Sequence, residues 1–254
     1  MEKLKEIIEY YKEEKWVWTH LGLSYNGCID TDFIEKYIEK PWSWGWDGIS
    51  MNTNINIEFI DKYIDKPWYW GIYGLSSNQC ITMKIIEKYI DKPWAWGSFG
   101  LSLNIKITAN FIYKYRNKEW CWGRNGFSSN PYIKLEFIEE FIEEEWDWGD
   151  TGLSNNNCIT TNFIEKYIEK PWSWGAYGLS SNRRVTIKFI EKYIDKEWEW
   201  GKNGISSNPN ITLEFINKYM YKKFDWGCDG LSSNESITKE IIDMYKYKPW
   251  YWGY

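Results

Sequence analysis

The sequence predicts an all-α protein, an α-solenoid of about nine 26-residue repeats with two helices in each repeat. Tryptophan recurs every 26 residues, and its register holds from residue 16 to residue 252 without a slip. Each repeat also carries the apolar spacing of one face of an α-helix. Such self-similarity is typical of repeat architectures, in which each unit packs on its neighbours along the chain.

The tryptophans define the repeat. They come in pairs, of which the first is numbered position 1 of the repeat and the second follows at position 3; Phe224 replaces the first one once. Only Trp46 of the 20 tryptophans lies at another position. Gly at position 7, Ser at 9, Asn at 11 and Ile at 19 are invariant. We therefore expect residues 1–254 to form a single array, with 1–15 as an N-terminal capping half-repeat and 250–254 as a truncated final repeat. The repeats start at residues 16, 42, 68, 94, 120, 146, 172, 198 and 224.

The first half of each repeat, from the frequent Pro at position 26 to the Ser at position 9, is predicted to be a short helix. The Asn at position 11 fits a left-handed C-cap. Each Gly lowers the stability of such a helix by roughly 1 kcal/mol, so the glycines are interpreted as flat spots that pack against a neighbour's tryptophan ring. On a helical wheel, positions 2, 5 and 6 and the invariant Ser lie opposite the Trp and Gly side.

The second half of each repeat is predicted to be an α-helix. Position 15 is Asp, Asn or Thr in eight of nine repeats, with Lys134 as the exception, and these residue types cap helix N-termini. Positions 18, 19, 22 and 23 are apolar, and the Pro at position 26 is expected to end the helix. In the capping half-repeat, Ile7, Ile8 and Tyr11 are expected to face inward. The tryptophan ladder is interpreted as core.

The units W-S-W-G-A-Y-G-L-S-S-N and F-I-E-K-Y-I-E-K-P-W resemble the tryptophan-repeat protein families of large DNA viruses, found in insect poxviruses and in giant viruses of amoebae. The resemblance covers essentially the whole chain. It implies a viral, host-directed repeat protein in the cytoplasm of an infected cell. It carries over no catalytic residue.

Composition argues against several function classes. The net charge of −5 disfavours general attraction to nucleic acid or to anionic membranes, and no apolar run is long enough to span a membrane. The N-terminus is too charged for a signal peptide, and the five cysteines are interpreted as reduced thiols in the cytoplasm. His20 is the only histidine, so we expect neither a Ser-His triad nor a His-based metal site. We therefore expect no enzyme, no metal and no cofactor.

The candidate binding surface consists of the variable positions 2, 5 and 6. Solenoids commonly use an extended face for binding, and aromatic and arginine side chains are frequent anchors of protein interfaces. Unconstrained drift at exposed positions explains the same variation equally well. The expected partner is a host or viral protein. The candidate residues are Trp46, Asp47, Tyr69, Tyr73, Phe99, Arg124, Asn125, Tyr177 and Lys202.

Two other functions stay open at this point. In the first, the variable pairs read nucleic-acid bases while the lysines at position 21 contact phosphates, although Glu140 interrupts that stripe. In the second, the protein is a structural viral component that assembles end to end through its aromatic C-terminus, Trp250 to Tyr254. The alternative interpretation, without a ligand, is that the lysines form a solvated face with weak ion pairs.

Overall fold

The computed structural model describes residues 2–11, 14–20 and 22–253. Every regular element in this part of the chain is helical, and no strand occurs there. The first helix, α1, spans Glu2–Tyr10. The later α-helices have six residues each and recur once per repeat: α2 (Thr31–Lys36), α3 (Ile57–Lys62), α4 (Met83–Lys88), α5 (Ala109–Lys114), α6 (Leu135–Glu140), α7 (Thr161–Lys166), α8 (Ile187–Lys192), α9 (Leu213–Lys218) and α10 (Lys239–Met244).

Three-residue 3-10 helices alternate with these α-helices. They occupy positions 8–10 of the repeat, and in the seventh repeat the same positions form a turn instead. The all-helical repeat pattern that the sequence predicts is therefore confirmed. The 3-10 helices are η1 (Leu23–Tyr25), η2 (Ile49–Met51), η3 (Leu75–Ser77), η4 (Leu101–Leu103), η5 (Phe127–Ser129), η6 (Leu153–Asn155), η7 (Ile205–Ser207) and η8 (Leu231–Ser233).

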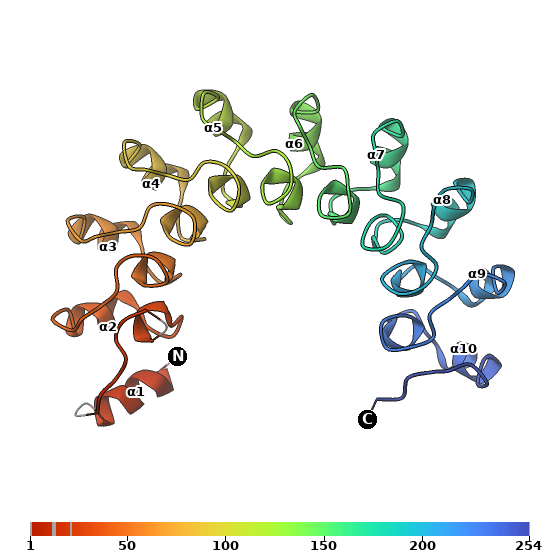
Figure 1. Ribbon diagram of the computed structural model, residues 1–254, viewed down its shortest axis with the longest axis horizontal. Helices are drawn as coiled ribbons and strands as arrows, with labels where there is room; N and C mark the ends of the chain where they lie inside the picture. Colours follow the sequence, from red (N-terminus) through yellow and green to blue (C-terminus); the bar gives the residue numbers. More distant parts are fainter. Residues whose placement is uncertain (1, 12–13, 21, 254) are drawn as a thin grey trace. The chain divides into compact units, whose positions relative to one another are not determined.

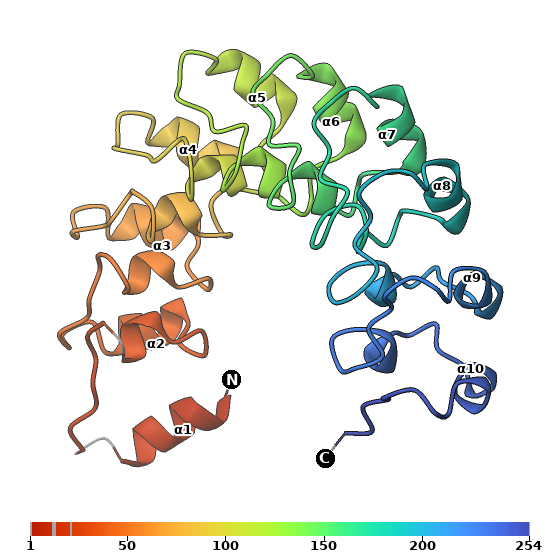
Figure 2. The same ribbon diagram turned by 45° about the vertical axis from the view of Figure 1, so that its right-hand side comes forward.

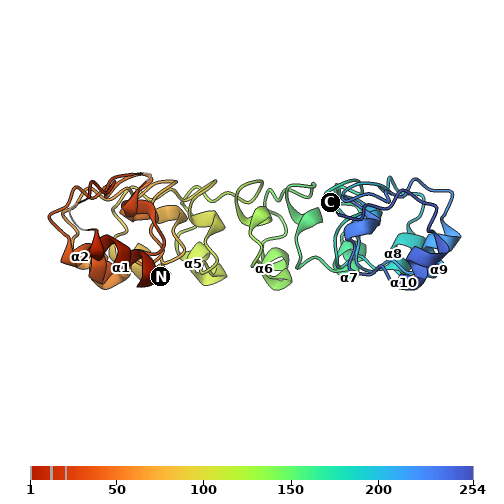
Figure 3. The ribbon, with the colours of Figure 1, turned by 90° about the horizontal axis from the view of Figure 1, so that it is seen from below.

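The chain divides into two compact units, Met1–Cys121 and Trp122–Tyr254. Within each unit the labelled α-helices form one row and the 3-10 turns form a second row beside it (Figure 1). The turned view shows α2 to α5 of the first unit following one another in chain order (Figure 2). Seen edge-on, the α-helices lie towards one edge of each unit and connecting loops towards the other (Figure 3).

The α-helices begin where the caps predict. The Asn56 side chain accepts the backbone N–H of Phe59 at 2.8 Å, and the Asp and Thr residues at position 15 do the same in their repeats. Lys134 makes no such bond, as expected. The helices end at position 21, because the residue at position 22 leaves the helical conformation (Tyr63, φ −116°, ψ 31°). The prolines at position 26 lie four residues after position 22, outside the helix, so the prediction that they end the helix is wrong.

The first half of the repeat is not a helix, and here the prediction of a two-helix repeat fails. Positions 26 to 3 have no regular secondary structure, positions 4–7 form a turn, and only positions 8–10 are helical. The segment closes as a loop, in which the N–H of Leu75 donates to the carbonyl of Tyr69 at 2.8 Å. A Cβ atom on Gly74 would lie 2.2 Å from that carbonyl oxygen. The Gly at position 7 is thus required by this loop closure and does not serve as a flat spot for a tryptophan ring.

The invariant Ser at position 9 is buried, so its predicted place on the variable face is wrong. The hydroxyl of Ser76 donates to the carbonyl of Trp70 at 2.5 Å and accepts the N–H of Ala95, in the next repeat, at 2.9 Å. Equivalent bonds recur in the other repeats of each unit. The Ser therefore joins two consecutive repeats through their backbones.

The invariant Asn at position 11 also joins repeats, and its backbone is extended (Asn78, φ −80°, ψ 125°). The prediction of a left-handed C-cap is therefore wrong. Its amide group donates to the carbonyls of Ser50 and Asn52 in the preceding repeat, at 3.0 and 2.9 Å. Its amide oxygen accepts the N–H of Cys80 at 2.9 Å. One side chain thus satisfies backbone groups in two repeats.

The tryptophan ladder packs in the core, as predicted, except at Trp252, which is 65% exposed. Trp44 stacks on Phe59 with ring centroids 5.9 Å apart, and its ring meets the edge of Trp68 at 5.2 Å. The indole N–H of Trp68 donates to the carbonyl of Tyr63 at 2.8 Å. Each pair of tryptophans thereby connects one repeat to the next, by an aromatic contact and by a hydrogen bond.

The N-terminal segment follows its prediction only in part. Ile8 is buried, and its expected inward placement is confirmed. Ile7 and Tyr11 are exposed, so their expected inward placement is wrong. Tyr11 lies beyond the end of α1, in a turn, and the helical spacing used for the prediction no longer applies there.

Candidate interaction surface

The variable residues lie on turns that immediately precede the 3-10 helices. In the fourth repeat, the N–H of Gly100 donates to the carbonyl of Gly97 at 3.1 Å and closes a four-residue β-turn. Position 6 is the third residue of this turn, and its φ lies between +51° and +61° wherever it is left-handed. A type II turn places its third residue in this region. The left-handed residues are Asp47, Tyr73, Phe99, Asn125, Tyr177 and Asn203.

These turn residues differ in how well they tolerate a left-handed backbone. Asn and Asp are enriched in this region, whereas bulky side chains are outliers there. Holding a residue in such a sparsely populated region costs on the order of 1–3 kcal/mol. Tyr73, Phe99 and Tyr177 nevertheless occupy it, and their side chains remain 48%, 43% and 56% exposed. Core packing therefore does not account for the aromatic residues at these three turns.

In the first unit, consecutive turns are connected to one another. The N–H of Tyr73 donates to the Ser77 hydroxyl at 3.3 Å, and this hydroxyl donates to the carbonyl of Phe99 at 2.5 Å. The neighbouring helices η1 to η4 pack side by side. Trp46 is 55% exposed, and Tyr69 is exposed on the segment that leads to the next turn.

The structure therefore brings together four of the predicted residues on three consecutive repeats of the first unit: Trp46, Tyr69, Tyr73 and Phe99, here termed the aromatic row. Asp47, which is partly buried, has the only charged side chain at positions 2, 5 and 6 of these repeats. The exposed surface of the aromatic row is consequently apolar, with hydroxyl groups only on its two tyrosines. Exposed aromatic groups of this kind are typical of binding surfaces.

The remaining predicted residues, Arg124, Asn125, Tyr177 and Lys202, belong to the second unit. Tyr177 is linked to the next turn, because its N–H donates to the carbonyl of Asn203 at 2.9 Å and its hydroxyl accepts the Asn203 amide at 2.7 Å. Lys202 pairs with Asp229 of the following turn at 2.6 Å. Asn203 and Asp229 are not among the predicted residues, although both occupy the variable position 6.

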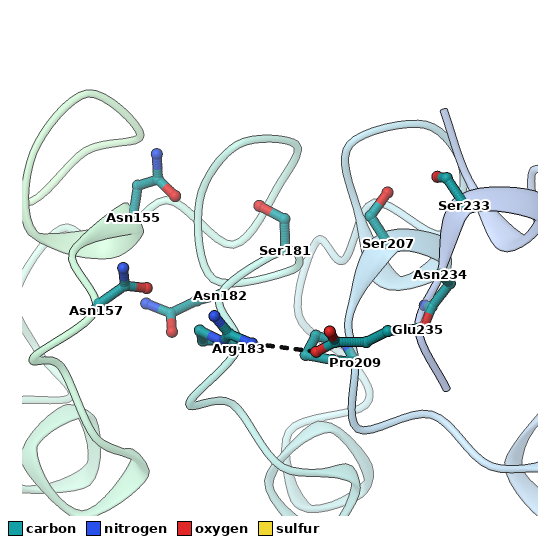
Figure 4. A pocket seen from close by; sticks show the side chains of 10 residues that line it. All are labelled: Asn155, Asn157, Ser181, Asn182, Arg183, Ser207, Pro209, Ser233, Asn234 and Glu235. Atoms are coloured by element: carbon teal, nitrogen blue, oxygen red, sulfur yellow. Dashed lines mark hydrogen bonds and ion pairs between the residues drawn. The ribbon is translucent and has the colours of Figure 1, made fainter. Parts of the chain in front are cut away.

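A polar trough of about 300 Å³ lies on the second unit. Hydroxyl groups of Ser181, Ser207 and Ser233 project side by side from successive repeats (Figure 4). Arg183 and Glu235, two repeats apart, form an ion pair at 3.1 Å across it. The trough lining is completed by Asn155, Asn157, Asn182, Pro209 and Asn234.

This trough adjoins the turns, because the Ser207 hydroxyl donates to the carbonyl of Asp229 at 2.9 Å. The sequence did not predict this trough. A signal was present at position 10, where short polar side chains recur in five successive repeats (Ser129, Asn155, Ser181, Ser207 and Ser233). Ser129 and Ser207 donate to a carbonyl of the following turn, whereas Ser181 and Ser233 donate to the carbonyl of the glycine at position 7 of their own repeat.

The lysines at position 21 are engaged within the protein. Lys192, for example, pairs with Glu165 of the preceding repeat at 2.8 Å, and this carboxylate raises the pKa of the lysine. The same ammonium lies 5.3 Å from the centroid of the Tyr193 ring. Equivalent ion pairs involve Lys36, Lys62, Lys88, Lys114, Lys166 and Lys218. A stripe of unpaired lysines for nucleic-acid phosphates is therefore not formed by these residues.

The described residues offer few candidates for a metal site, a thiol nucleophile or a membrane-spanning helix. No three His, Cys, Asp or Glu side chains there are placed to hold a metal ion. Burial raises the pKa of the Cys80 and Cys158 thiols to about 12, which opposes a nucleophilic role. None of the described helices combines the length and the apolar character needed to cross a membrane. Comparisons with protein-family models, with curated proteins and with solved structures find no match to this chain.

Proposed function

We propose that this chain is a non-enzymatic α-solenoid of nine repeats that binds a protein partner through its turn residues. The aromatic row of the first unit is the main contact surface in this proposal. The resemblance to viral tryptophan-repeat proteins makes a host or viral protein the expected partner, and the cytoplasm of an infected cell the expected location.

The observation that carries the proposal is the pair of exposed aromatic side chains, Tyr73 and Phe99, on left-handed turn residues. Asp47 or Asn125 occupies the same backbone position elsewhere in the chain without a comparable conformational cost. Two large aromatic side chains on a costly backbone and in contact with water reduce the stability of the free protein. Binding to a partner offsets that cost, because buried aromatic anchors supply much of the free energy of protein association.

The test is a quantitative capture experiment with a variant that leaves the turns intact. The double variant Tyr73→Asn, Phe99→Asn removes both aromatic groups and installs a residue that favours left-handed backbone. The immobilised full chain is incubated with nuclease-treated host-cell lysate at about 0.15 M salt, near physiological ionic strength. Bound proteins are then quantified by mass spectrometry. We expect one or more specific partners of the wild-type chain to be lost from the variant.

The matched control is Tyr132→Asn, Tyr221→Asn, which removes two exposed tyrosines outside the aromatic row. It should retain the partners. Equal loss from both variants, or full retention by the first, contradicts the proposal. Nuclease-sensitive capture would instead favour the nucleic-acid alternative. A loss of oligomer mass in light scattering after removal of residues 250–254 would favour self-assembly.

A further inference from the structure

The tryptophan at position 3 carries a cation in most repeats. The ammonium group of the lysine at position 25 lies 5.1–5.5 Å from the centroid of this ring in eight repeats. At this distance the ammonium group is attracted by the negative face of the indole. The pairs are Lys40–Trp18, Lys66–Trp44, Lys92–Trp70, Lys118–Trp96, Lys170–Trp148, Lys196–Trp174, Lys222–Trp200 and Lys248–Trp226.

The fifth repeat lacks this lysine. Glu144 occupies position 25, and its N–H donates to the carbonyl of Phe141 at 3.0 Å, as the N–H of Lys170 in the next repeat does to the carbonyl of Tyr167 at the same distance. The backbone that elsewhere presents the lysine is thus retained. Trp122 is only partly buried, and within the described part of the chain no lysine or arginine lies over its ring.

The core holds the Trp122 ring in place from other directions. Its centroid lies 4.9 Å from that of Phe127, 4.9 Å from that of Phe141 and 5.3 Å from that of Trp146. The contact with Trp146 corresponds to the one between Trp44 and Trp68 in the first unit. The ring is therefore positioned by packing and does not depend on a cation for its orientation.

The negative charge of the chain segment that contains Glu144 favours the binding of a cation from another molecule. Glu139 pairs with Lys166 at 2.7 Å, but no ion pair in the described residues involves Glu140, Glu143, Glu144 or Glu145. These four carboxylates are here termed the acid block. Glu140 is the last residue of α6, and the other three lie just after this helix (Figure 1). Unpaired carboxylates of one sign raise the local concentration of cations.

We propose that the face of Trp122 and the carboxylate of Glu144 bind a lysine side chain from a basic segment of a partner protein. The incoming ammonium takes the place over the ring that the chain's own lysine takes in eight other repeats. In this repeat the residue at position 25, Glu144, pairs with the incoming ammonium. In eight other repeats the residue at position 25 is the lysine that supplies the ammonium. This site is separate from the aromatic row and does not rest on the function proposed for it.

The variant Glu144→Lys tests the site, because it restores the intramolecular lysine. The probe is a fluorescein-labelled peptide of alternating glycine and lysine, whose binding to the full chain is followed by fluorescence anisotropy. We expect Glu144→Lys to weaken binding about tenfold, which corresponds to about 1.4 kcal/mol. The same variant should melt at a higher temperature than the wild-type chain, because the added ammonium covers the ring.

Glu143→Lys is the matched control, with the same change of charge at an exposed residue of the acid block. Its effect should be about twofold, as for the loss of one exposed charge pair. A peptide with trimethyllysine should bind, whereas one with norleucine should not, because only the first carries a cation. Equal weakening by both variants, or no binding of the lysine peptide to the wild-type chain, overturns the proposal. The aromatic-row variant Tyr73→Asn, Phe99→Asn should bind this peptide normally, so the two proposals fail independently.

Discussion

Replacing the buried Ser206 by alanine should break a connection between two repeats of the second unit. Its hydroxyl donates to the carbonyl of Trp200 at 2.6 Å and accepts the N–H of Asp225 at 2.9 Å. Alanine nearly preserves the side-chain volume, so the loss is confined to these two hydrogen bonds. The Trp200 carbonyl keeps a second donor, the N–H of Ser206 at 3.2 Å. The group left without a partner is therefore the N–H of Asp225.

An unpaired buried N–H costs about 1–3 kcal/mol. Because Asp225 is only partly buried, we expect Ser206→Ala to lower the free energy of unfolding by about 1–2 kcal/mol. For a unit of this size, that corresponds to a decrease in Tm of about 3–8 °C. Exchange of the Asp225 amide hydrogen should accelerate about 5–30-fold, because local opening becomes easier by the same free energy.

The assay combines thermal melting followed by circular dichroism with hydrogen exchange of the segment around Asp225. Ser233→Ala is the control, because its exposed hydroxyl donates only to the carbonyl of Gly230 at 3.2 Å and water replaces it. That variant should change the free energy of unfolding by less than about 0.5 kcal/mol. Equal Tm values for both variants, with unchanged exchange at Asp225, would refute the assigned role of the Ser at position 9.

Three further predictions follow from the same repeat geometry. Gly204→Ala should lower the free energy of unfolding by about 2–3 kcal/mol in urea titrations, because its Cβ would lie 2.2 Å from a carbonyl oxygen; an unchanged midpoint contradicts this. Lys134→Thr should raise it by about 0.5–1 kcal/mol, because α6 gains a cap, and a lower Tm would oppose that reasoning. Lys88, and to a lesser extent the Tyr89 hydroxyl, lowers the pKa of Asp61 below its usual value. The ionised carboxylate therefore stabilises the fold at pH values above its unfolded pKa, and this stabilisation is lost as the pH falls through the folded pKa. Tyr89→Phe should therefore raise the pKa of Asp61 in a carboxyl-carbon NMR titration, and the loss of stability in acid should begin at a higher pH. An unchanged titration would show that the hydroxyl contributes nothing.

The second half of the repeat was predictable because its signals are local. A capping side chain at position 15 and an apolar stripe at positions 18 and 19 both act within one turn of an α-helix, and both appear in the structure. The burial of the tryptophans was predictable for a related reason. Large aromatic groups at a fixed register can be kept out of water only by packing on their neighbours.

The first half of the repeat could not be predicted in the same way, because its stabilising bonds are not local. The Ser and Asn at positions 9 and 11 act on backbone groups 19 to 28 residues away, as Ser76 and Asn78 show. Helical-wheel reasoning placed the Ser on the solvent side because no partner was visible in the sequence. The tight approach at Gly74 was equally hidden, because it depends on a loop closure that the wheel does not represent.

The variable positions lie on a turn and on the segment before it, and not on the predicted helix face, and the structure explains why they can vary. Position 2 contributes its N–H and its carbonyl to the loop closure and to the Ser bridge, and position 6 contributes its carbonyl to the link between turns. Because these bonds use the backbone, they are compatible with many side chains, although Asp147, Glu199 and Asp225 at position 2 also accept the N–H of the glycine at position 4. The left-handed φ at position 6 is the one remaining constraint, and Asn or Asp satisfies it best. Drift alone should therefore lead to Asn, Asp or Gly at that position. Tyr177 departs from this pattern but bonds to Asn203 within the protein, whereas the exposed Tyr73 and Phe99 are the residues for which the proposed partner contact would account.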